Sequence, residues 1–146
     1  MNGFEQYFEQ RIENDQWDVA PLLYKGLSQT AEQDVIEFES VPLSRKTLGK
    51  QVAGFQQWLA ERGLHKGDSV AVMLSNTAEH IALLYALMLS GVIWIPVNTK
   101  VKGPGVRYIV EHATPSLVIA ESEFAEVLAD AGIAAGQWVE LQNIVL

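Results

Sequence analysis

The sequence predicts an α/β fold built on a parallel sheet, and three observations predict it. Helix-like and strand-like segments alternate from residue 45 to residue 131, the connections between them are short, and the strand-like segments are nearly continuous apolar runs. Parallel strands joined by helical crossovers produce this order, and strands covered on both faces are apolar throughout. With 146 residues and 49% apolar side chains, the chain can bury the core that this fold requires.

The first forty residues contain weaker signals than the rest. Residues 3–13 carry four apolar side chains near helical spacing, which predicts a short amphipathic helix. Residues 17–28 are apolar without a clear period, so we expect an irregular segment packed against the rest of the chain. Residues 35–39 alternate as Val-Ile-Glu-Phe-Glu shortly before Pro42, which predicts a strand at a sheet edge.

A helix after residue 44 is the clearest local prediction. Ser44 or Thr47 can cap its start, and Gly63 is placed to end it in the left-handed conformation. Gly67 lies in the tight turn that follows, where we expect a positive φ. The apolar stripe of this helix has a 3.6-residue period and consists of Leu48, Val52, Phe55 and Leu59.

Three strand-and-helix units follow this helix. Asn76 is predicted to cap the first of their helices, with Glu79 three positions later, and Gly91 and Gly132 are predicted to end helices. The predicted strands are residues 69–74, 92–97 and 116–120, the predicted helices are residues 76–91, 102–112 and 121–131, and a last apolar strand is predicted over 137–146.

Composition excludes several kinds of protein. The chain has no cysteine, so disulfides, thiolate metal sites and a cysteine nucleophile are excluded, and we expect a cytoplasmic protein. The net charge of −8 argues against binding to nucleic acid, because phosphate contacts need a basic surface. The charge is uneven, however: residues 41–112 carry eight bases and four acids between two acidic segments. His65, His80 and His112 are too far apart in the chain for a local metal motif.

One uncharged run has almost the length of a membrane span. Residues 81–97 contain no charged side chain. Helix-forming residues occupy this run up to Gly91, whereas β-branched and aromatic residues follow it. A helix, a break and a buried strand explain this change of composition better than a span does, so we expect no membrane span. The N-terminus has no apolar segment of the kind found in signal peptides.

Local sequence motifs for catalysis are absent. No nucleophile elbow and no phosphate loop occurs, and Gly103-Pro104-Gly105 is predicted to be the start of a helix. In open parallel sheets, ligands bind beyond the carboxyl ends of the strands. Polar and basic residues follow two strands there, so an anion site is one hypothesis, and a helix cap with solvated lysines and an Arg107–Glu111 pair is the simpler one. The residues in question are Ser75, Asn76, Thr77, Asn98, Thr99, Lys100, Lys102 and Arg107.

Two segments together resemble a known enzyme family. Residues 62–79, RGLHKGDSVAVMLSNTAE, combine a helix end, a Gly-Asp turn, an apolar strand and Asn-x-x-Glu. Residues 91–98, GVIWIPVN, supply a glycine and a strand that ends in Pro-x-Asn. In this order and spacing they resemble the N-terminal region of the adenylate-forming (AMP-binding) superfamily, which includes acyl-CoA synthetases, aryl-CoA ligases, luciferases and the adenylation domains of peptide synthetases. The resemblance extends over roughly residues 20–125.

The resemblance implies a parent enzyme and a role for this chain within it. The parent would be an acid–thiol ligase, such as a long-chain fatty-acid or carnitine-type CoA ligase of fatty acid metabolism. It would use ATP, magnesium and coenzyme A to convert a carboxylic acid into an acyl-adenylate and then an acyl-CoA. The family's phosphate loop, adenine-binding motifs and catalytic lysine lie downstream. We therefore assign no catalytic, cofactor-binding or metal residue, and expect residues 1–146 to be a Rossmann-like N-terminal subdomain fragment, inactive alone.

Two features leave room for another interpretation. The family's usual Thr-Tyr before the first helix is Ser44-Arg45 here, and the loop over 102–105 is also unusual, so the substrate class is open. The alternative is a stand-alone Rossmann-like binding or interaction module without catalysis.

A fragment should leave apolar surface uncovered near Trp94, Trp138 and the last strand, and should therefore form a homo-oligomer. A reading frame that continues past Leu146 into a phosphate loop would favour the fragment.

Overall fold

The computed structural model describes residues 19–29 and 32–144. The helix predicted over residues 3–13 lies outside this part of the chain. The main sheet has four parallel strands in the order β4-β3-β5-β6. Val70 of the central strand β3 lies opposite Trp94 of β4 and Leu117 of β5. The four strands are β3 (Ser69–Met73), β4 (Ile93–Pro96), β5 (Leu117–Ala120) and β6 (Val139–Glu140). The predicted parallel α/β fold is therefore confirmed.

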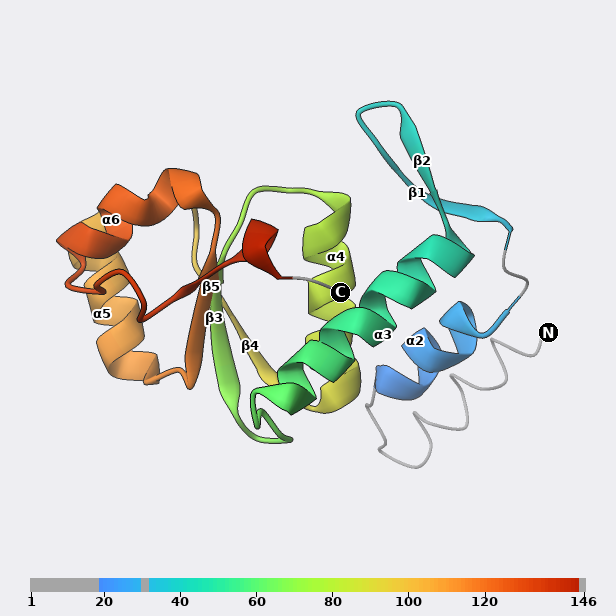
Figure 1. Cartoon of the computed structure of the whole chain (residues 1–146), viewed down its shortest axis with the longest axis horizontal. Helices are drawn as coiled ribbons and strands as arrows, with labels where there is room; N and C mark the ends of the chain where they lie inside the picture. Colours follow the sequence, from blue (N-terminus) through green and yellow to red (C-terminus); the bar gives the residue numbers. More distant parts are fainter. Residues whose placement is uncertain (1–18, 30–31, 145–146) are drawn as a thin grey trace, which may run out of the picture.

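Helices cover both faces of this sheet, as Figure 1 shows. Helices α3 (Arg45–Glu61) and α4 (Ala78–Ser90) lie on one side, and α5 (Gly103–Ala113) and α6 (Ala125–Asp130) lie on the other. The side chains of β3 alternate between the two layers. Val70 and Val72 belong to the hydrophobic cluster under α3 and α4, whereas Ala71 and Met73 belong to the cluster under α5.

Helix α3 begins and ends as its sequence predicts. The Ser44 hydroxyl caps it by accepting a hydrogen bond from the Thr47 amide at 3.2 Å. At the other end Gly63 has φ +72°, and the Leu64 amide donates to the Leu59 carbonyl at 3.1 Å. Gly67 has φ +96° in the turn that leads to β3, as expected. The predicted apolar stripe is buried along its whole length.

The N-terminal part of the described chain differs from the prediction. Residues predicted to be irregular form helix α2 (Ala20–Leu27), which begins with a proline in its first turn and packs on α3 and α4. Eight residues make about two turns, too few to show a clear apolar period. The predicted strand is β1 (Asp34–Phe38), but it pairs with β2 (Val41–Ser44) in a separate antiparallel hairpin. The hairpin turn has positive φ at Glu39 and Ser40, residues that do not signal such a turn.

The C-terminal part also departs from the prediction in two places. The helix predicted over 121–131 is split into a short 3-10 helix, η1 (Ser122–Phe124), followed by α6. The long strand predicted over 137–146 is wrong, because only Val139 and Glu140 pair with β5 before the 3-10 helix η2 (Leu141–Asn143) begins. An apolar run alone does not distinguish a strand from a packed irregular segment.

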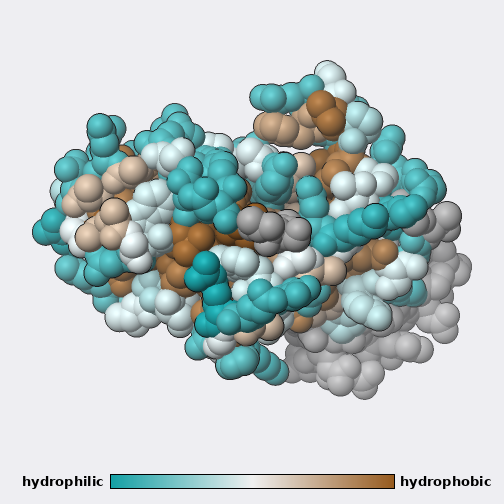
Figure 2. All heavy atoms as spheres, viewed as in Figure 1, coloured by the Kyte–Doolittle hydropathy of each residue, from teal (hydrophilic) through white to brown (hydrophobic). Residues whose placement is uncertain are grey.

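Large apolar side chains are exposed on helices α2 and α5, where Tyr24 and Tyr108 are the most exposed, and at two strand edges. Val41 of the hairpin is 67% exposed, and Ile93 on the edge strand β4 is 55% exposed. In Figure 2 brown residues appear at the hairpin and in the middle of the visible face. Trp94 and Trp138, which were expected to be uncovered, are half-buried and pack against the two clusters. None of the helices in the described part of the chain is long and apolar enough to cross a membrane.

Candidate functional site

The carboxyl ends of β3 and β4 enclose a cleft of about 450 Å³. This is the position at which open parallel sheets bind ligands. Its polar side chains are uncharged or aromatic, and none of the described lysines, arginines or carboxylates lines it. The cleft is lined by Val72, Leu74, Asn76, His80, Trp94, Pro96, Val97, Asn98 and Thr99. The topology therefore brings three of the predicted candidates, Asn76, Asn98 and Thr99, around one opening, but without the basic residues.

The cap of α4 is Thr77 and not Asn76. Thr77 has extended backbone angles, and its hydroxyl accepts a hydrogen bond from the His80 amide at 3.1 Å. The prediction that Asn76 caps this helix is therefore wrong by one residue. Both residue types are good caps, so the sequence could not choose between them. The shift leaves the Asn76 side chain on the wall of the cleft, while Glu79 lies in the first turn as predicted.

His80 and Trp94 form the inner wall of the cleft. The His80 Nδ1 atom lies 3.0 Å from the Ser75 carbonyl oxygen, which can only accept, so Nδ1 carries a proton. In the neutral ring, Nε2 is then an acceptor. Nε2 of His80 and Nε1 of Trp94 are both buried and have no hydrogen-bond partner among the described residues. The two rings meet edge to face, with centroids 6.3 Å apart.

A carboxylate, not a cation, occupies the end of β3. Glu121 is only 7% exposed, and its Oε2 atom accepts a hydrogen bond from the Ser75 amide at 2.9 Å. The Ser75 hydroxyl lies 3.2 Å from Glu123. Two acidic side chains therefore satisfy the strand end, and their charge disfavours an anion there. The helical spacing of 121–131 did not reveal this role for Glu121.

The predicted basic group at this edge is not assembled. Lys100 and Lys102 are exposed and do not line the cleft. Arg107 points to the end of α6, where its Nε and NH2 atoms donate to the carbonyl oxygens of Ala131 and Asp130 at 3.0 and 2.9 Å. A guanidinium at a helix C-terminus satisfies carbonyl groups that have no partner in the helix. The hypothesis of an anion site that includes Arg107, and the alternative pair with Glu111, are both wrong.

The glycines near residue 104 serve packing. Helix α5 begins at Gly103 with Pro104 in its first turn, as predicted. A Cβ atom on Gly103 would lie 2.5 Å from the Cβ atom of Asp130, so this glycine lets α5 approach α6 closely.

Among the described residues no three His, Asp or Glu side chains gather as metal ligands. The geometry of this region is therefore that of a scaffold with one neutral cleft.

Comparison with known proteins identifies the scaffold. Residues 24–143 match the AMP-binding enzyme family, which covers most of the chain. The chain belongs to this family. Among its relatives, enterobactin synthase component F of Escherichia coli (strain K12) is 26% identical over 113 residues, which are 77% of this chain and 9% of that protein. The uncharacterized acyl-CoA ligase YtcI of Bacillus subtilis (strain 168) is 33% identical over 76 residues, or 52% of this chain and 14% of that protein.

Solved structures share the fold of this AMP-binding chain. VinN in complex with 3-methylaspartate superposes with a TM-score of 0.76 at 25% identity, over 88% of this chain and 35% of VinN. This chain therefore spans about a tenth of the curated relatives it matches and about a third of that structure. The matched part is the N-terminal region of adenylate-forming enzymes, as the resemblance of residues 62–98 implies.

Proposed function

We propose that this chain is the N-terminal part of an ATP-dependent acid–thiol ligase. Such an enzyme joins a carboxylic acid to AMP, releasing pyrophosphate, and then transfers the acyl group to coenzyme A. The observation that carries the proposal is the family match over residues 24–143, together with the acyl-CoA ligase identity of YtcI. ATP, magnesium and coenzyme A are the co-reactants that this reaction needs.

The role proposed for these residues within the ligase is structural. Two of the polar groups that follow the strands are used internally, with Glu121 on the Ser75 amide and Thr77 on the amide of His80. Clustered backbone amides that could hold phosphates are not offered by any motif of the sequence. Nucleotide binding and the chemical steps would then belong to other parts of the enzyme, and these 146 residues alone would be inactive.

A second candidate has a different acyl acceptor. Enterobactin synthase component F matches more of this chain than YtcI does. This match supports an adenylation domain of the peptide-synthetase type, which activates an acid but does not release an acyl-CoA. The two candidates share the first half-reaction and differ only in the second.

An assay of the whole polypeptide that the cell makes distinguishes the two candidate functions. The polypeptide that carries these residues is purified through an affinity tag placed before Met1 and is assayed for exchange of pyrophosphate into ATP. Aliphatic, aromatic and betaine-type acids are tested, with omission of the acid as control. Exchange with one acid class, followed by formation of its acyl-CoA, supports the ligase.

The other results of this experiment each have one meaning. Exchange without acyl-CoA formation in the presence of coenzyme A supports the peptide-synthetase type. Absence of exchange with every acid overturns both candidates and favours a stand-alone binding module. The 146-residue chain, assayed in parallel, should give no exchange.

A further inference from the structure

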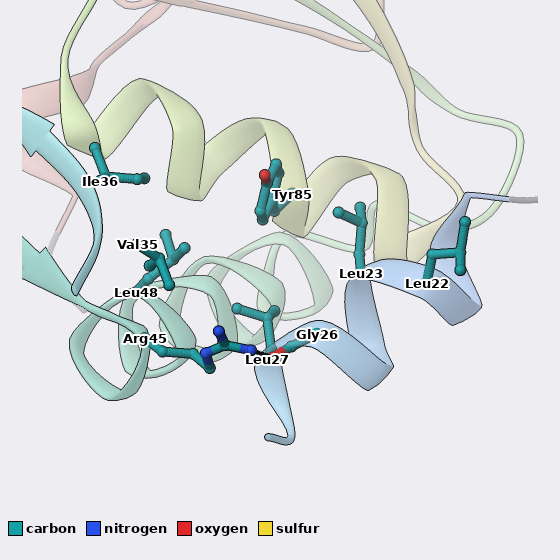
Figure 3. A pocket seen from close by; sticks show the side chains of 9 residues that line it. All are labelled: Leu22, Leu23, Gly26, Leu27, Val35, Ile36, Arg45, Leu48 and Tyr85. Carbon is teal, nitrogen blue, oxygen red and sulfur yellow. Dashed lines mark hydrogen bonds between the residues drawn. The ribbon is translucent and has the colours of Figure 1, made fainter. Parts of the chain in front are cut away.

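A small apolar pocket with a single cation lies away from the sheet edge. It has a volume of about 190 Å³ and lies between α2, the start of α3, α4 and β1. Leucine, valine and isoleucine side chains form its walls, among them Leu23, Leu27 and Leu48. Figure 3 shows Arg45 reaching along one side of the pocket to Gly26, with Tyr85 on the opposite side. Among the described residues that line the pocket, Arg45 alone is charged.

The guanidinium of Arg45 has hydrogen-bond partners but no counter-charge among the described residues. NH1 donates to the Gly26 carbonyl at 2.6 Å and to the Gln29 side-chain oxygen at 3.2 Å, and NH2 donates to Gln33 at 3.0 Å. All three acceptors are neutral. The Nε atom is buried and has no partner in the described part of the chain. The ion pair nearest in sequence joins Lys46 and Glu32 and does not include Arg45.

Two further features make this place favourable for a negative charge. Arg45 is the first residue of the seventeen-residue helix α3, and its side chain therefore lies near the positive end of the helix dipole. NH2 of Arg45 carries two hydrogens, of which Gln33 accepts one, so a bound acceptor can take the other. A carboxylate that accepts from a guanidinium forms a charge-assisted hydrogen bond, which is stronger than a bond between neutral groups.

The volume limits what can accompany the carboxylate. An apolar protein cavity of about 150 Å³ can hold benzene, a molecule of six carbon atoms. A pocket of about 190 Å³ therefore accommodates a hydrocarbon chain of similar size. The leucine-rich walls offer such a chain contacts but no hydrogen bonds.

We propose that this pocket binds a short-chain aliphatic monocarboxylate of up to about six carbons. The carboxylate accepts from the guanidinium of Arg45, and the hydrocarbon chain lies among Leu23, Leu27 and Leu48. The site is separate from the cleft at the ends of β3 and β4. The proposal does not depend on the proposed ligase activity, because binding needs neither ATP nor coenzyme A.

The first test uses the unmodified 146-residue chain and three probes of equal length. Hexanoate, 1-hexanol and hexylammonium are titrated into methyl-labelled protein, and the leucine methyl signals are followed by NMR. Hexanoate should shift Leu23 and Leu27 in a saturable manner and leave Leu128, in the other hydrophobic cluster, unchanged. It should bind at least about tenfold more tightly than hexanol, because only the acid uses the charged donor. Butyrate should bind more weakly, by roughly fourfold per methylene removed.

Variants then assign the charge preference to one residue. Arg45→Met keeps the length of the side chain and removes the charge, so its affinity for hexanoate should fall to that for hexanol, while hexanol binding is retained. Lys50→Met, which removes one charge from an exposed position of the same helix, should bind like the unmodified chain.

Three results would overturn the proposal. They are equal binding of hexanoate and hexanol by the unmodified chain, shifts that spare Leu23 and Leu27, and a preference for hexanoate that survives in Arg45→Met. If Arg45→Met does not fold, or loses hexanol binding as well, the comparison of the three probes on the unmodified chain decides alone.

Discussion

Strand β3 and helix α2 belong to one chain but are held in place by different interactions. From Val70 to Met73 no residue of β3 exposes more than 2% of its surface, whereas α2 has no fully buried residue. The hairpin beside α2 is also largely exposed. The N-terminal layer, defined as residues 20–29 and 32–44, packs Leu27, Ile36 and Leu43 against the larger hydrophobic cluster. It also makes polar contacts with α3, where Arg45 is bonded to Gly26 and Lys46 is paired with Glu32. Complete burial of apolar side chains therefore stabilises the sheet, whereas partial burial and directional contacts together position the layer.

The same contrast separates the cleft at the sheet edge from the pocket that Arg45 lines. At the sheet edge Glu121 accepts from the Ser75 amide, and no charged side chain of the described residues lines the cleft there. Where α3 meets the N-terminal layer, the guanidinium of Arg45 has neutral partners and, within the described chain, a buried donor without a partner. The fold's usual ligand position is thus not the place where charge remains unpaired. The following substitutions test this contrast, beginning with the largest expected effect.

Truncation of a buried leucine should cost the most stability. Leu87 of α4 is 0% exposed and belongs to the cluster on one face of the sheet. Leu87→Ala should lower the free energy of unfolding by about 2–5 kcal/mol, measured by urea denaturation. Met88→Ala, at a position 38% exposed, is the matched control and should cost far less. Equal losses in the two variants would contradict a sheet stabilised by burial.

A substitution at the contact between α5 and α6 should have the next largest effect on the free energy of unfolding. Gly103→Ala places a Cβ atom 2.5 Å from Asp130 Cβ and 3.0 Å from its carbonyl carbon, so it should cost about 1–3 kcal/mol. Gly49 lies inside α3, and a Cβ atom added to it would meet nothing within 4 Å. Gly49→Ala should therefore stabilise the chain by about 0.5–1 kcal/mol. The melting temperatures of both variants are compared with that of the unmodified chain. Shifts of the same sign in the two variants would contradict the prediction that only Gly103 is needed for close packing.

The cap of α4 should have an intermediate effect. Thr77→Ala removes the hydroxyl that accepts from the His80 amide, and should cost about 1 kcal/mol. Asn76→Ala changes a residue of the cleft wall that does not cap the helix, so it should melt within a degree or so of the unmodified chain. Differential scanning calorimetry can resolve this difference. A larger loss of stability for Asn76→Ala than for Thr77→Ala would show that Asn76 caps the helix, as the sequence predicted.

The surface ion pair of the N-terminal layer should matter least. The side chains of Lys46 and Glu32 are 53% and 75% exposed, and such pairs contribute about 0–1 kcal/mol. Lys46→Ala should therefore change urea stability only slightly, and the change should shrink further in high salt. A loss as large as that of Leu87→Ala would show that the layer is coupled to the core more strongly than its exposure suggests.

The accuracy of the sequence predictions follows the same division. The stripe of α3, its Ser44 cap and Gly63, and the parallel strands were predictable, because period, cap chemistry and positive φ are local properties. Helix α2 is too short to show a period, and the hairpin turn uses Glu39 and Ser40 in place of the usual glycine or asparagine. These elements take their conformation from contacts with the rest of the chain.

The candidate site was predictable only in position. The order of strands placed Asn76, Asn98 and Thr99 around one cleft, as expected for an open parallel sheet. Which charges face that cleft depends on distant partners: Arg107 is drawn to the end of α6, 23 and 24 residues away, and Glu121 reaches back 46 residues to Ser75. No local spacing encodes such pairings.

The central claim is that this chain supplies the scaffold of an adenylate-forming enzyme and does not bind the nucleotide. Isothermal titration of the 146-residue chain with ATP and magnesium tests it most directly. We predict no saturable heat, because the sheet edge presents Glu121 and an uncharged cleft in place of a phosphate cradle. A dissociation constant in the low micromolar range, which corresponds to about −8 kcal/mol, would contradict the claim.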